Sequence, residues 1–369
     1  MNNIMQWLRV IVDMRQQKKI KHLLKDIVAI VFFASLANAD EWVGIYYFGV
    51  SNEKFLRKYL ELPNGIPSHD TIQRVFSMVS PEYLKEFRRR WNEVMSGSMG
   101  EKIKRILALD GKTQCGNGTA KQKANHIVSA VDDKGFCLDE VLVDEKTNEI
   151  KAIPELLTAL NIKGHIITTD AMGCQTEIVK IIRSKHADYV LALKGNQGNL
   201  YDDVKDYFDD PELLTGCSYF KTPLEKAHSG IEKREYWQTD DISWLEQKKA
   251  WVGLTSIGMT KNTITKNGET KTEMRYFISS LPLNVEEMAR AIRSHWMVES
   301  YHWHLDVTFR EDANHTLDKD AAYNLNIIKK LAINTLKLVD VGIQKISLKM
   351  KRYMISMNFE RYFDFLMAI

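Results

Sequence analysis

The sequence predicts an α/β fold, a mixed sheet flanked by helices, with helical regions before and after it along the chain. Two observations carry this prediction. Strand-like and helix-like runs alternate between residues 104 and 197, whereas residues 1–98 and 321–369 read as helical. Alternation of this kind is typical of layered α/β folds with parallel strand pairing. We expect three regions, a helical domain at 1–98, an α/β domain at 99–320 and a basic helical region at 321–369.

Residues 1–98 are expected to form short helices joined by tight turns. The run from Lys21 to Leu36 is largely apolar and contains neither Gly nor Pro. Further on, Ser68 can cap one helix, and Pro81 can stand in the first turn of the next. Such helices suit a helix-turn-helix DNA reader and equally suit a dimerisation or packing module.

We expect no part of the chain to cross a membrane. Its best apolar run, residues 27–37, is shorter than the ~20 residues that a span needs. Basic residues precede this run and residues 37–39 imitate a signal-peptide cleavage site, but the segment before it is long and contains Asp13 and Asp26. A buried helix is therefore expected. Four cysteines without a CxxC pair argue against a zinc ribbon or a disulfide framework and fit a reducing cytoplasm.

The middle of the chain contains five strand-like runs with two helix-like runs among them. The strand-like runs are RILALDG, NHIVSAVDD, GFCLDEVLVDE, HIITTDA and DYVLALKG. Helices are expected around residues 153–160 and over TEIVKIIRSKHA, and residues 132–135 suit a hairpin turn. The order of three strands, helix, strand, helix, strand matches the ribonuclease-H-like fold.

Residues 198 to about 283 interrupt this order. After a helix near Leu200 to Phe208, the runs YWQTD, KAWVGLTSIGMT and EMRYFISSL look like strands. Asn267-Gly268 is a turn signal between the last two. We therefore expect a β-rich insertion at about 209–283, between the fifth core strand and the helix-like run that follows.

Three acidic residues occupy the places where a metal-dependent nuclease needs them. Asp110 ends the first strand-like run, Asp170 follows the fourth, and Glu299 lies in the helix-like run AIRSHWMVESYHWHLDVTFRED. Each alone is more often a turn or surface residue, but carboxylates are the ligands that Mg²⁺ prefers, and two such ions can drive phosphodiester cleavage. The trio predicts catalytic metal ligands Asp110, Asp170 and Glu299, with Mg²⁺ as the cofactor and Mn²⁺ able to replace it.

The stretches around these residues resemble a known family. They are ALDGKT, DEKTNEIKAIPELL, IKGHIITTDAMGCQ, DYVLALKGNQGNL, RYFISSL, IRSHWMVES…HWHLDVTFRED and, near the start, NGIPSHDTIQRVF. Over nearly its whole length the chain resembles the DDE insertion-sequence transposases of the H-repeat-associated (ISAs) type. The resemblance implies a ribonuclease-H-like core that uses Asp110, Asp170 and Glu299 with Mg²⁺, and an accessory domain at 1–98. It also implies hydrolytic release of 3′ ends at the element's termini and their attack on target DNA.

The chain departs from the wider insertion-sequence group around Glu299. In that group a Tyr and an Arg precede the catalytic Glu and a Lys follows it, whereas the places here hold Ile292, His295 and Asp306. The segment between Glu299 and the next His-Trp pair is also one residue shorter than in related members, which turns a helix by about 100°. The roles of His302, His304 and Asp306 are left open.

Several polar and aromatic residues near the trio are candidates for DNA contact. Lysine can meet a phosphate, Asn or Gln can bond backbone or base, and Trp can stack on an unpaired base. The alternatives are that the polar residues belong to an ordinary surface loop and that the tryptophan lies in the core. The candidates are Lys112, Lys194, Asn196, Gln197, Arg293, His295 and Trp296.

The charge of the chain is unevenly spread. Residues 1–30 hold six Lys and Arg against two Asp and Glu, and residues 321–369 hold eight against three. Basic ends around an acidic centre suit DNA held over a carboxylate site, although solvated helix faces are the commoner cause. The expected partners are DNA, as terminal inverted repeats and target, and further copies of the chain, because two ends must be handled together. The expected location is the cytoplasm, in association with the nucleoid.

Two other functions stay open. A catalytically inactive or domesticated DNA-binding relative would share the motifs, although the intact trio argues against decay of the site. A zinc or iron hydrolase would draw on the five ligand-type residues between 295 and 306. HExxH is absent, however, and His302 and His304 stand two apart, so a helix would point them to different faces.

Overall fold

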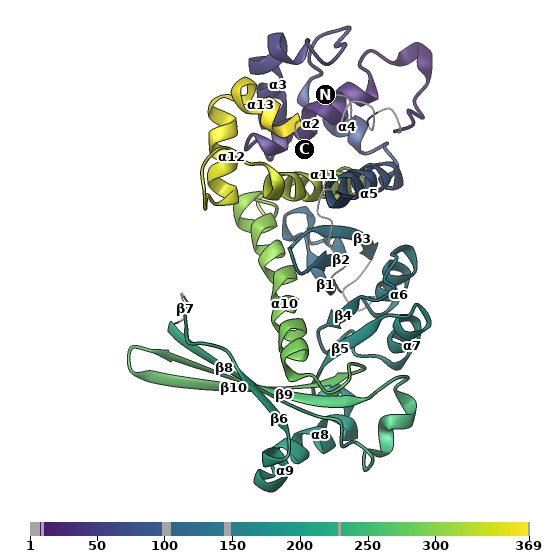
Figure 1. The fold of residues 1–369 in the computed structure, drawn as a ribbon. Helices are drawn as coiled ribbons and strands as arrows, with labels where there is room; N and C mark the ends of the chain where they lie inside the picture. The colour runs from purple at the N-terminus through teal and green to yellow at the C-terminus, as the bar shows by residue number, and fades with distance from the viewer. Residues whose placement is uncertain (1–7, 9–10, 98–104, 144–148, 228–229, 368–369) are drawn as a thin grey trace.

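The computed structural model describes residues 8, 11–97, 105–143, 149–227 and 230–367. A mixed sheet lies at the centre, and helices from both ends of the chain gather beyond one of its edges (Figure 1). The strands are β1 (Ile106–Thr113), β2 (His126–Asp132), β3 (Cys137–Val143), β4 (Ile166–Thr169), β5 (Asp188–Leu193), β6 (Ser218–Lys221), β7 (Glu225–Ala227), β8 (Gly230–Thr239), β9 (Ser256–Lys266) and β10 (Glu269–Ser279).

The helices fall into a terminal group and a group that flanks the sheet. The terminal group comprises α2 (Leu24–Leu36), α3 (Trp42–Leu56), α4 (His69–Phe76), α5 (Pro81–Gly97), α11 (Lys319–Leu338), α12 (Leu348–Met357) and α13 (Phe359–Met367). The sheet group comprises α6 (Glu149–Ala159), α7 (Thr176–Ser184), α8 (Asn199–Asp209), α9 (Pro211–Thr215) and α10 (Val285–Trp303), and a π-helical turn at His304–Thr308 follows α10.

The predicted mixed α/β sheet is confirmed. Strands run in the order β3-β2-β1-β4-β5-β10-β9-β8-β6, with β7 paired to β8. β1 is antiparallel to β2 and parallel to β4, which is parallel to β5. The hairpin turn expected at 132–135 is present, since the Gly135 amide donates to the Asp132 carbonyl at 2.8 Å and Gly135 has φ +78°. The helix expected to begin near residue 153 extends back to Glu149, so Pro154 lies inside it.

The β-rich insertion continues the same sheet. β10 pairs antiparallel with β5, and β9, β8 and β6 follow outward. Both Asn267 and Gly268 have positive φ, 53° and 84°, as the two-residue hairpin turn between β9 and β10 requires. One expected strand, the run KAWVGLTSIGMT, begins later than predicted. Residues 249–250 end a 3₁₀ helix, Trp251 and Leu254 are buried in irregular chain, and β9 begins only at Ser256.

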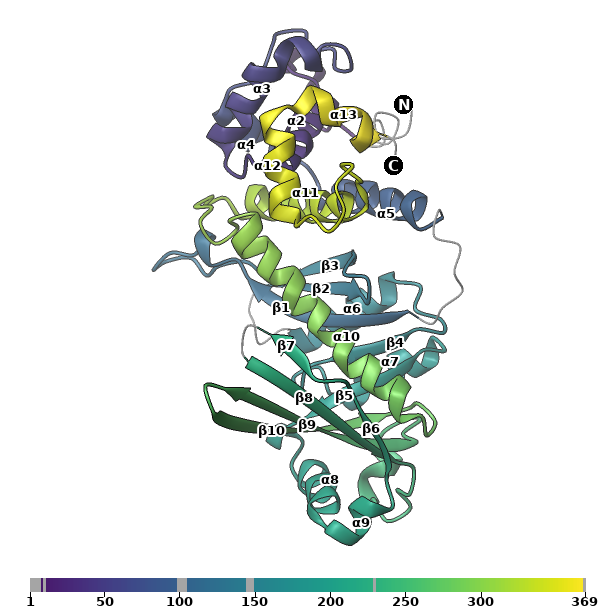
Figure 2. The same cartoon turned by 60° about the vertical axis from the view of Figure 1, so that its left-hand side comes forward.

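The two faces of the sheet carry different layers. Side chains alternate along a strand, so Leu107 and Leu109 pack with α6, α7 and α8, whereas Ile106 packs with Met288 and Ala291 of α10. α10 crosses its own face of the sheet, from the β8–β10 end towards β1 (Figure 2). By the same alternation, Asp110 and Lys112 belong to the face that α10 covers.

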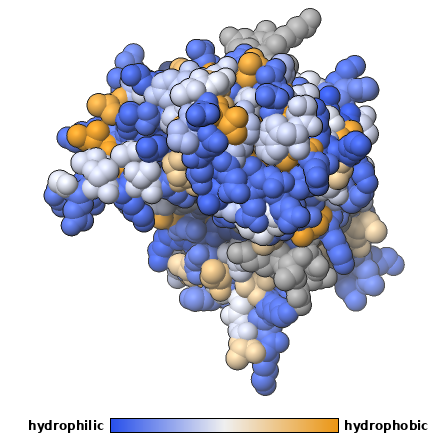
Figure 3. Space-filling view, turned by 90° about the horizontal axis from the view of Figure 1, so that it is seen from below, coloured by the Kyte–Doolittle hydropathy of each residue, from blue (hydrophilic) through white to orange (hydrophobic). Residues whose placement is uncertain are grey.

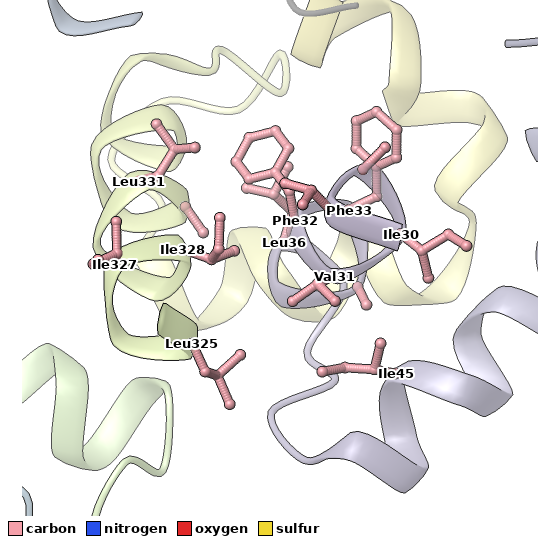
Figure 4. Close-up of a cluster of buried hydrophobic side chains, with 14 of the residues drawn as sticks. Ile30, Val31, Phe32, Phe33, Leu36, Ile45, Leu325, Ile327, Ile328 and Leu331 are labelled. Carbon is pink, nitrogen blue, oxygen red and sulfur yellow. The ribbon is translucent and has the colours of Figure 1, made fainter. Parts of the chain in front are cut away.

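The terminal helices share one hydrophobic core. Every residue of α2 except Lys25 is buried, which confirms the buried helix expected there. In Figure 4 the side chains of α2 lie between α11, which contributes Ile328 and Leu331, and α3, which contributes Ile45. The ring of Phe33 packs against Phe359 and Phe363 of α13. No helix among the described residues is long and apolar enough to cross a membrane. How the chain divides into domains stays a prediction, but helices from its two ends pack as one body.

Buried ion pairs account for part of the positive charge near the C-terminus. Arg352 is fully buried, and its Nη2 donates to Asp40 Oδ1 at 2.6 Å. Lys330 is also buried and pairs with Glu140, which in turn accepts from Arg88 Nη1 at 2.6 Å. These cations join the helices to each other and to β3, and are therefore neither solvated nor open to DNA.

The surface at the opposite end of the molecule is polar. Viewed from the end that carries α8 and α9, hydrophilic side chains dominate and apolar ones are scattered among them (Figure 3). Scattered apolar side chains are normal for a folded surface.

Candidate active site

Asp110 lies in β1 on the face covered by α10, with its side chain 24% exposed. Its Oδ2 is 3.4 Å from Nδ1 of His302, near the end of α10. Burial would raise the pKa of Asp110, but the hydrogen bond from His302 and the electrostatic interactions with His302 and His295 bring it below its ordinary value. The carboxylate is therefore ionised at neutral pH.

Asp170 follows β4 and begins a tight loop. Its Oδ1 accepts from the amides of Met172 and Gly173 at 3.0 and 3.2 Å. Gly173 is required there, because a Cβ would lie 2.7 Å from the side chain of Thr169. These contacts fix one carboxylate oxygen and leave the other to the cavity.

Two residues that were predicted to contact DNA hold the Asp170 loop in place. Asn196 Nδ2 donates to the Ala171 carbonyl at 2.8 Å, and Gln197 Nε2 donates to the Cys174 carbonyl at 2.6 Å. The turn after β5 is thus tied to the turn after β4. The amides of Asn196 and Gln197 are engaged with protein backbone, so their placement supports a positioning role.

Glu299 and His295 face the sheet from one side of α10, four residues apart. His295 Nδ1 lies 3.1 Å from Oγ1 of Thr168. Burial lowers the pKa of His295, although Asp110 and Asp170 oppose this effect, and the ring is neutral at pH 7. Partial desolvation and the negative charge of Asp110 raise the pKa of Glu299.

One cavity gathers the three acids that are far apart in the sequence. It has a volume of about 340 Å³ and lies between the middle of β1, the ends of β4 and β5, the middle of β10 and α10. Asp110 was expected to end its strand, but β1 continues to Thr113 because its later residues still pair with β2. Its lining includes Asp110, Asp170, Glu299, Lys194, His295 and Trp296. Neighbouring parallel strands and one helix therefore bring these six predicted residues together.

The donor chemistry of the cavity fits a hard divalent cation, since the acids offer carboxylate oxygens and the charge of Asp110 opposes ionisation of Glu299. A cation between them would relieve that repulsion. Among the described residues, however, no group of three or more His, Cys, Asp and Glu side chains is already arranged to hold a metal ion. The Asp110 carboxylate instead faces His302.

Lys112 does not line this cavity. Only 10% of its side chain is exposed, and Nζ lies 2.6 Å from Asp306, 3.4 Å from Asp312 and 3.7 Å from Glu311. Three carboxylates thus surround the ammonium that was expected to meet a phosphate. Asp306 stands where the wider group has Lys, and here it serves as the partner of Lys112.

The histidines after Glu299 take separate partners. His302 contacts Asp110, whereas His304 Nδ1 lies 3.1 Å from Oγ1 of Thr308 within the π-helical turn. They do not converge, so the arrangement gives the zinc or iron hydrolase no support.

Three residues near the trio were absent from the predictions or left without a role. Thr168 stands two residues before Asp170, so strand alternation alone could have placed it on the same face. His302 had been noted without a role. Arg275 of β10 lines the cavity, and its Cζ is 5.3 Å from the ring centre of Trp296, which is 41% exposed. No local pattern links Arg275 to α10, because the contact depends on how β10 pairs.

Comparison with known proteins agrees with this geometry. The family described as "Transposase DDE domain" matches residues 101–335, and "DDE_Tnp_1-associated" matches residues 5–92. The chain belongs to the DDE transposase family. The first match covers the whole sheet and α10, and hence all three acids of this DDE transposase.

Relatives of this DDE transposase align over almost the full chain. "Putative transposase YncI" of Escherichia coli O157:H7 is 37% identical, covering 96% of this chain and 92% of that protein. "Putative protein YbfL" and "H repeat-associated putative transposase YhhI", both of Escherichia coli K12, are each 35% identical, with 97% of both chains covered. The resemblance to the H-repeat-associated type is thereby confirmed.

Proposed function

We propose that this DDE transposase cleaves DNA at the ends of its element and transfers the freed 3′ ends into target DNA. One observation carries the proposal, namely that Asp110, Asp170 and Glu299 line a single cavity. The order β3-β2-β1-β4-β5, with β1, β4 and β5 parallel, supports a ribonuclease-H-like core as its scaffold. The alternative, an inactive or domesticated DNA-binding relative, is not favoured, because the acids are present and gathered.

Each side chain in the cavity has a chemical task under this proposal. Asp110, Asp170 and Glu299 would hold Mg²⁺ or Mn²⁺, which supplies an activated water or hydroxyl and neutralises the phosphate. Asp170 is preset by its own loop, whereas Asp110 must exchange His302 for the ion. Lys194 is exposed at the rim and can meet a phosphate as a point charge. Neutral His295 keeps its hydrogen bond to Thr168 and fixes α10 against β4.

The partner under this proposal is DNA, both the terminal inverted repeats of the element and the target. Several copies of the chain would bind it together, in the cytoplasm and in association with the nucleoid. Residues 1–98 would contribute to DNA binding, as the match at 5–92 to the transposase-associated family supports. Handling two ends in one complex requires more than one active site, which is the reason for proposing a homo-oligomer.

Substitution of each acid tests the proposal. Asp110→Asn, Asp170→Asn and Glu299→Gln should each lower cleavage of end-bearing DNA by roughly 10³-fold or more, while DNA binding persists. Asp202→Asn, an exposed carboxylate of α8 on the other face of the sheet, is the matched control and should leave cleavage unchanged. Cleavage should need Mg²⁺ or Mn²⁺ and stop in Ca²⁺ or chelator. Activity that persists in chelator would refute the metal mechanism.

A further inference from the structure

A second groove opens beside the carboxylate cavity. It has a volume of about 610 Å³ and lies between α10 and strands β7 to β10, the part of the sheet that projects away from the body in Figure 1. We call it the arm groove. The cations in its lining are Lys226, Arg234, Lys261, Arg275 and Arg293.

The arm groove is continuous with the carboxylate cavity. Glu273, Arg275, Ile292 and Trp296 line both. Trp296 presents an exposed ring at the junction, with the guanidinium of Arg275 over it. A polyanionic chain that lies in the cavity can therefore continue into the arm groove without leaving the protein surface.

One carboxylate oxygen in the arm groove lies between two guanidinium groups. Arg234 Nη1 donates to Glu225 Oε2 at 2.6 Å, and Arg293 Nη2 lies 3.9 Å from the same oxygen. Arg234 is oriented by a second contact with Glu232 and is only 15% exposed. Glu225 and Arg293 are each 48% exposed, so solvent and ligands reach the pair.

We propose that Arg234 and Arg293 form a binding site for one backbone phosphate of DNA, and that Glu225 occupies this site until DNA displaces it. The proposal rests on the proposed function for the identity of the ligand. A carboxylate and a phosphodiester both present anionic oxygens to a guanidinium, and arginine pairs with either. Arg234, from β8, is fixed before binding, whereas Arg293, from α10, has room to close on the phosphate.

Other features of the arm groove agree with this assignment. It carries five cations against three carboxylates, Glu225, Glu232 and Glu273. Displacing Glu225 would leave a larger positive excess along the path. The exposed Trp296 ring stands one helical turn beyond Arg293, where a base next to the bound phosphate could stack.

Equilibrium binding of the full-length chain to a fluorescent DNA duplex, measured across a salt series without divalent metal, tests the site. Arg293→Gln should weaken binding about tenfold and lower the slope of log affinity against log salt by about one, as loss of one phosphate contact predicts. Glu225→Gln should tighten binding several-fold. Lys205→Gln, an exposed cation of α8 paired with Asp209 on the other face of the sheet, should bind as the wild type does.

The double variant distinguishes a shared site from a general charge effect. If Glu225 competes with phosphate for Arg293, the gain from Glu225→Gln should shrink when Arg293→Gln is also present. Strictly additive effects, or single variants that bind as the wild type does, would overturn the phosphate site while the cleavage results for Asp110→Asn still support the proposed function. A wild-type chain that binds no DNA would overturn both proposals.

Discussion

His302 Nδ1 lies 3.4 Å from Oδ2 of Asp110 and holds the end of α10 against β1. The contact spans 192 positions of sequence and is one of those that join the helix that carries Glu299 to the strand that carries Asp110. Burial raises the pKa of the Asp110 carboxyl, and among the interactions that lower it the hydrogen bond with His302 is the largest.

His302→Gln should therefore raise the pKa of Asp110. Burial remains, while the hydrogen bond and the electrostatic interaction with the imidazole that offset it are lost. The measurement is an NMR titration of the Asp110 carboxyl carbon in the protein without metal. His304→Gln is the matched control, because His304 contacts Thr308 instead. If the pKa of Asp110 is the same in His302→Gln as in the wild type, the histidine does not control it.

Gly111→Ala should destabilise the fold by about 1–3 kcal/mol, as overpacking of a tight core does. A Cβ at Gly111 would lie 2.4 Å from Glu149 Oε1 and 2.5 Å from His126 Nε2. These two atoms are 2.6 Å apart in a buried pair, so neither side chain can turn away freely. Urea unfolding measures the change. Gly195→Ala, which would meet nothing within 4 Å, should leave stability unchanged, and equal effects of the two would refute this packing argument.

Local patterns were sufficient to predict the strands that carry the site. Hydrophobic runs located β1, β4 and β5, and Asn267-Gly268 located the turn between β9 and β10, because such signals depend only on neighbouring residues. Alternation along β1 and β4 then puts Asp110 and Asp170 on the face of α10. Local patterns do not show which part of the protein lies opposite each acid. Only the family resemblance allowed that to be inferred.

Long-range contacts could not be predicted. The 3.4 Å distance between His302 and Asp110, and the pairing of Lys112 with Asp306, depend on where α10 ends against β1. The strand expected over 249–260 begins only at Ser256, because Trp251 and Leu254, whose apolar character suggested a strand, fill the core from irregular chain. No local pattern indicates that β10 pairs with β5. This pairing extends the one sheet through the insertion.

Arg352→Met should cost about 3–5 kcal/mol of stability, because it leaves Asp40 as a buried charge without its partner. Arg352 is fully buried, donates to Asp40 at 2.6 Å and to the Ser35 carbonyl at 2.8 Å, and stacks on Phe309. The measurement is the urea midpoint of the whole chain. Lys58→Gln breaks an exposed ion pair with Glu360 that also joins the two ends, and it should leave the midpoint unchanged. Similar losses for both would contradict the special weight of the buried pair.

Lys337 makes the stability of the fold depend on pH above neutrality. Burial lowers the pKa of its ammonium to about 8, although Asp132 opposes this effect. Its Nζ donates to the Gly135 carbonyl at 2.5 Å and lies 5.7 Å from the centre of the Tyr301 ring. Because the unfolded chain holds this proton up to about pH 10.4, it binds more protons than the folded chain between pH 8 and 10.4. The contribution of Lys337 to folding free energy therefore becomes more favourable as pH rises through that window.

Lys337→Met should remove this dependence. The free energy of unfolding of the wild type minus that of the variant should increase from pH 7 to pH 10. Over that range only the folded wild type loses the proton of a buried ammonium, which removes the unfavourable free energy of burying that charge. Other titrating groups are common to both proteins and cancel in the difference. Urea unfolding at several pH values measures it, with the exposed Lys349→Met as the control whose difference should stay flat. A flat difference for Lys337→Met as well would mean that this ammonium keeps an ordinary pKa in the folded protein.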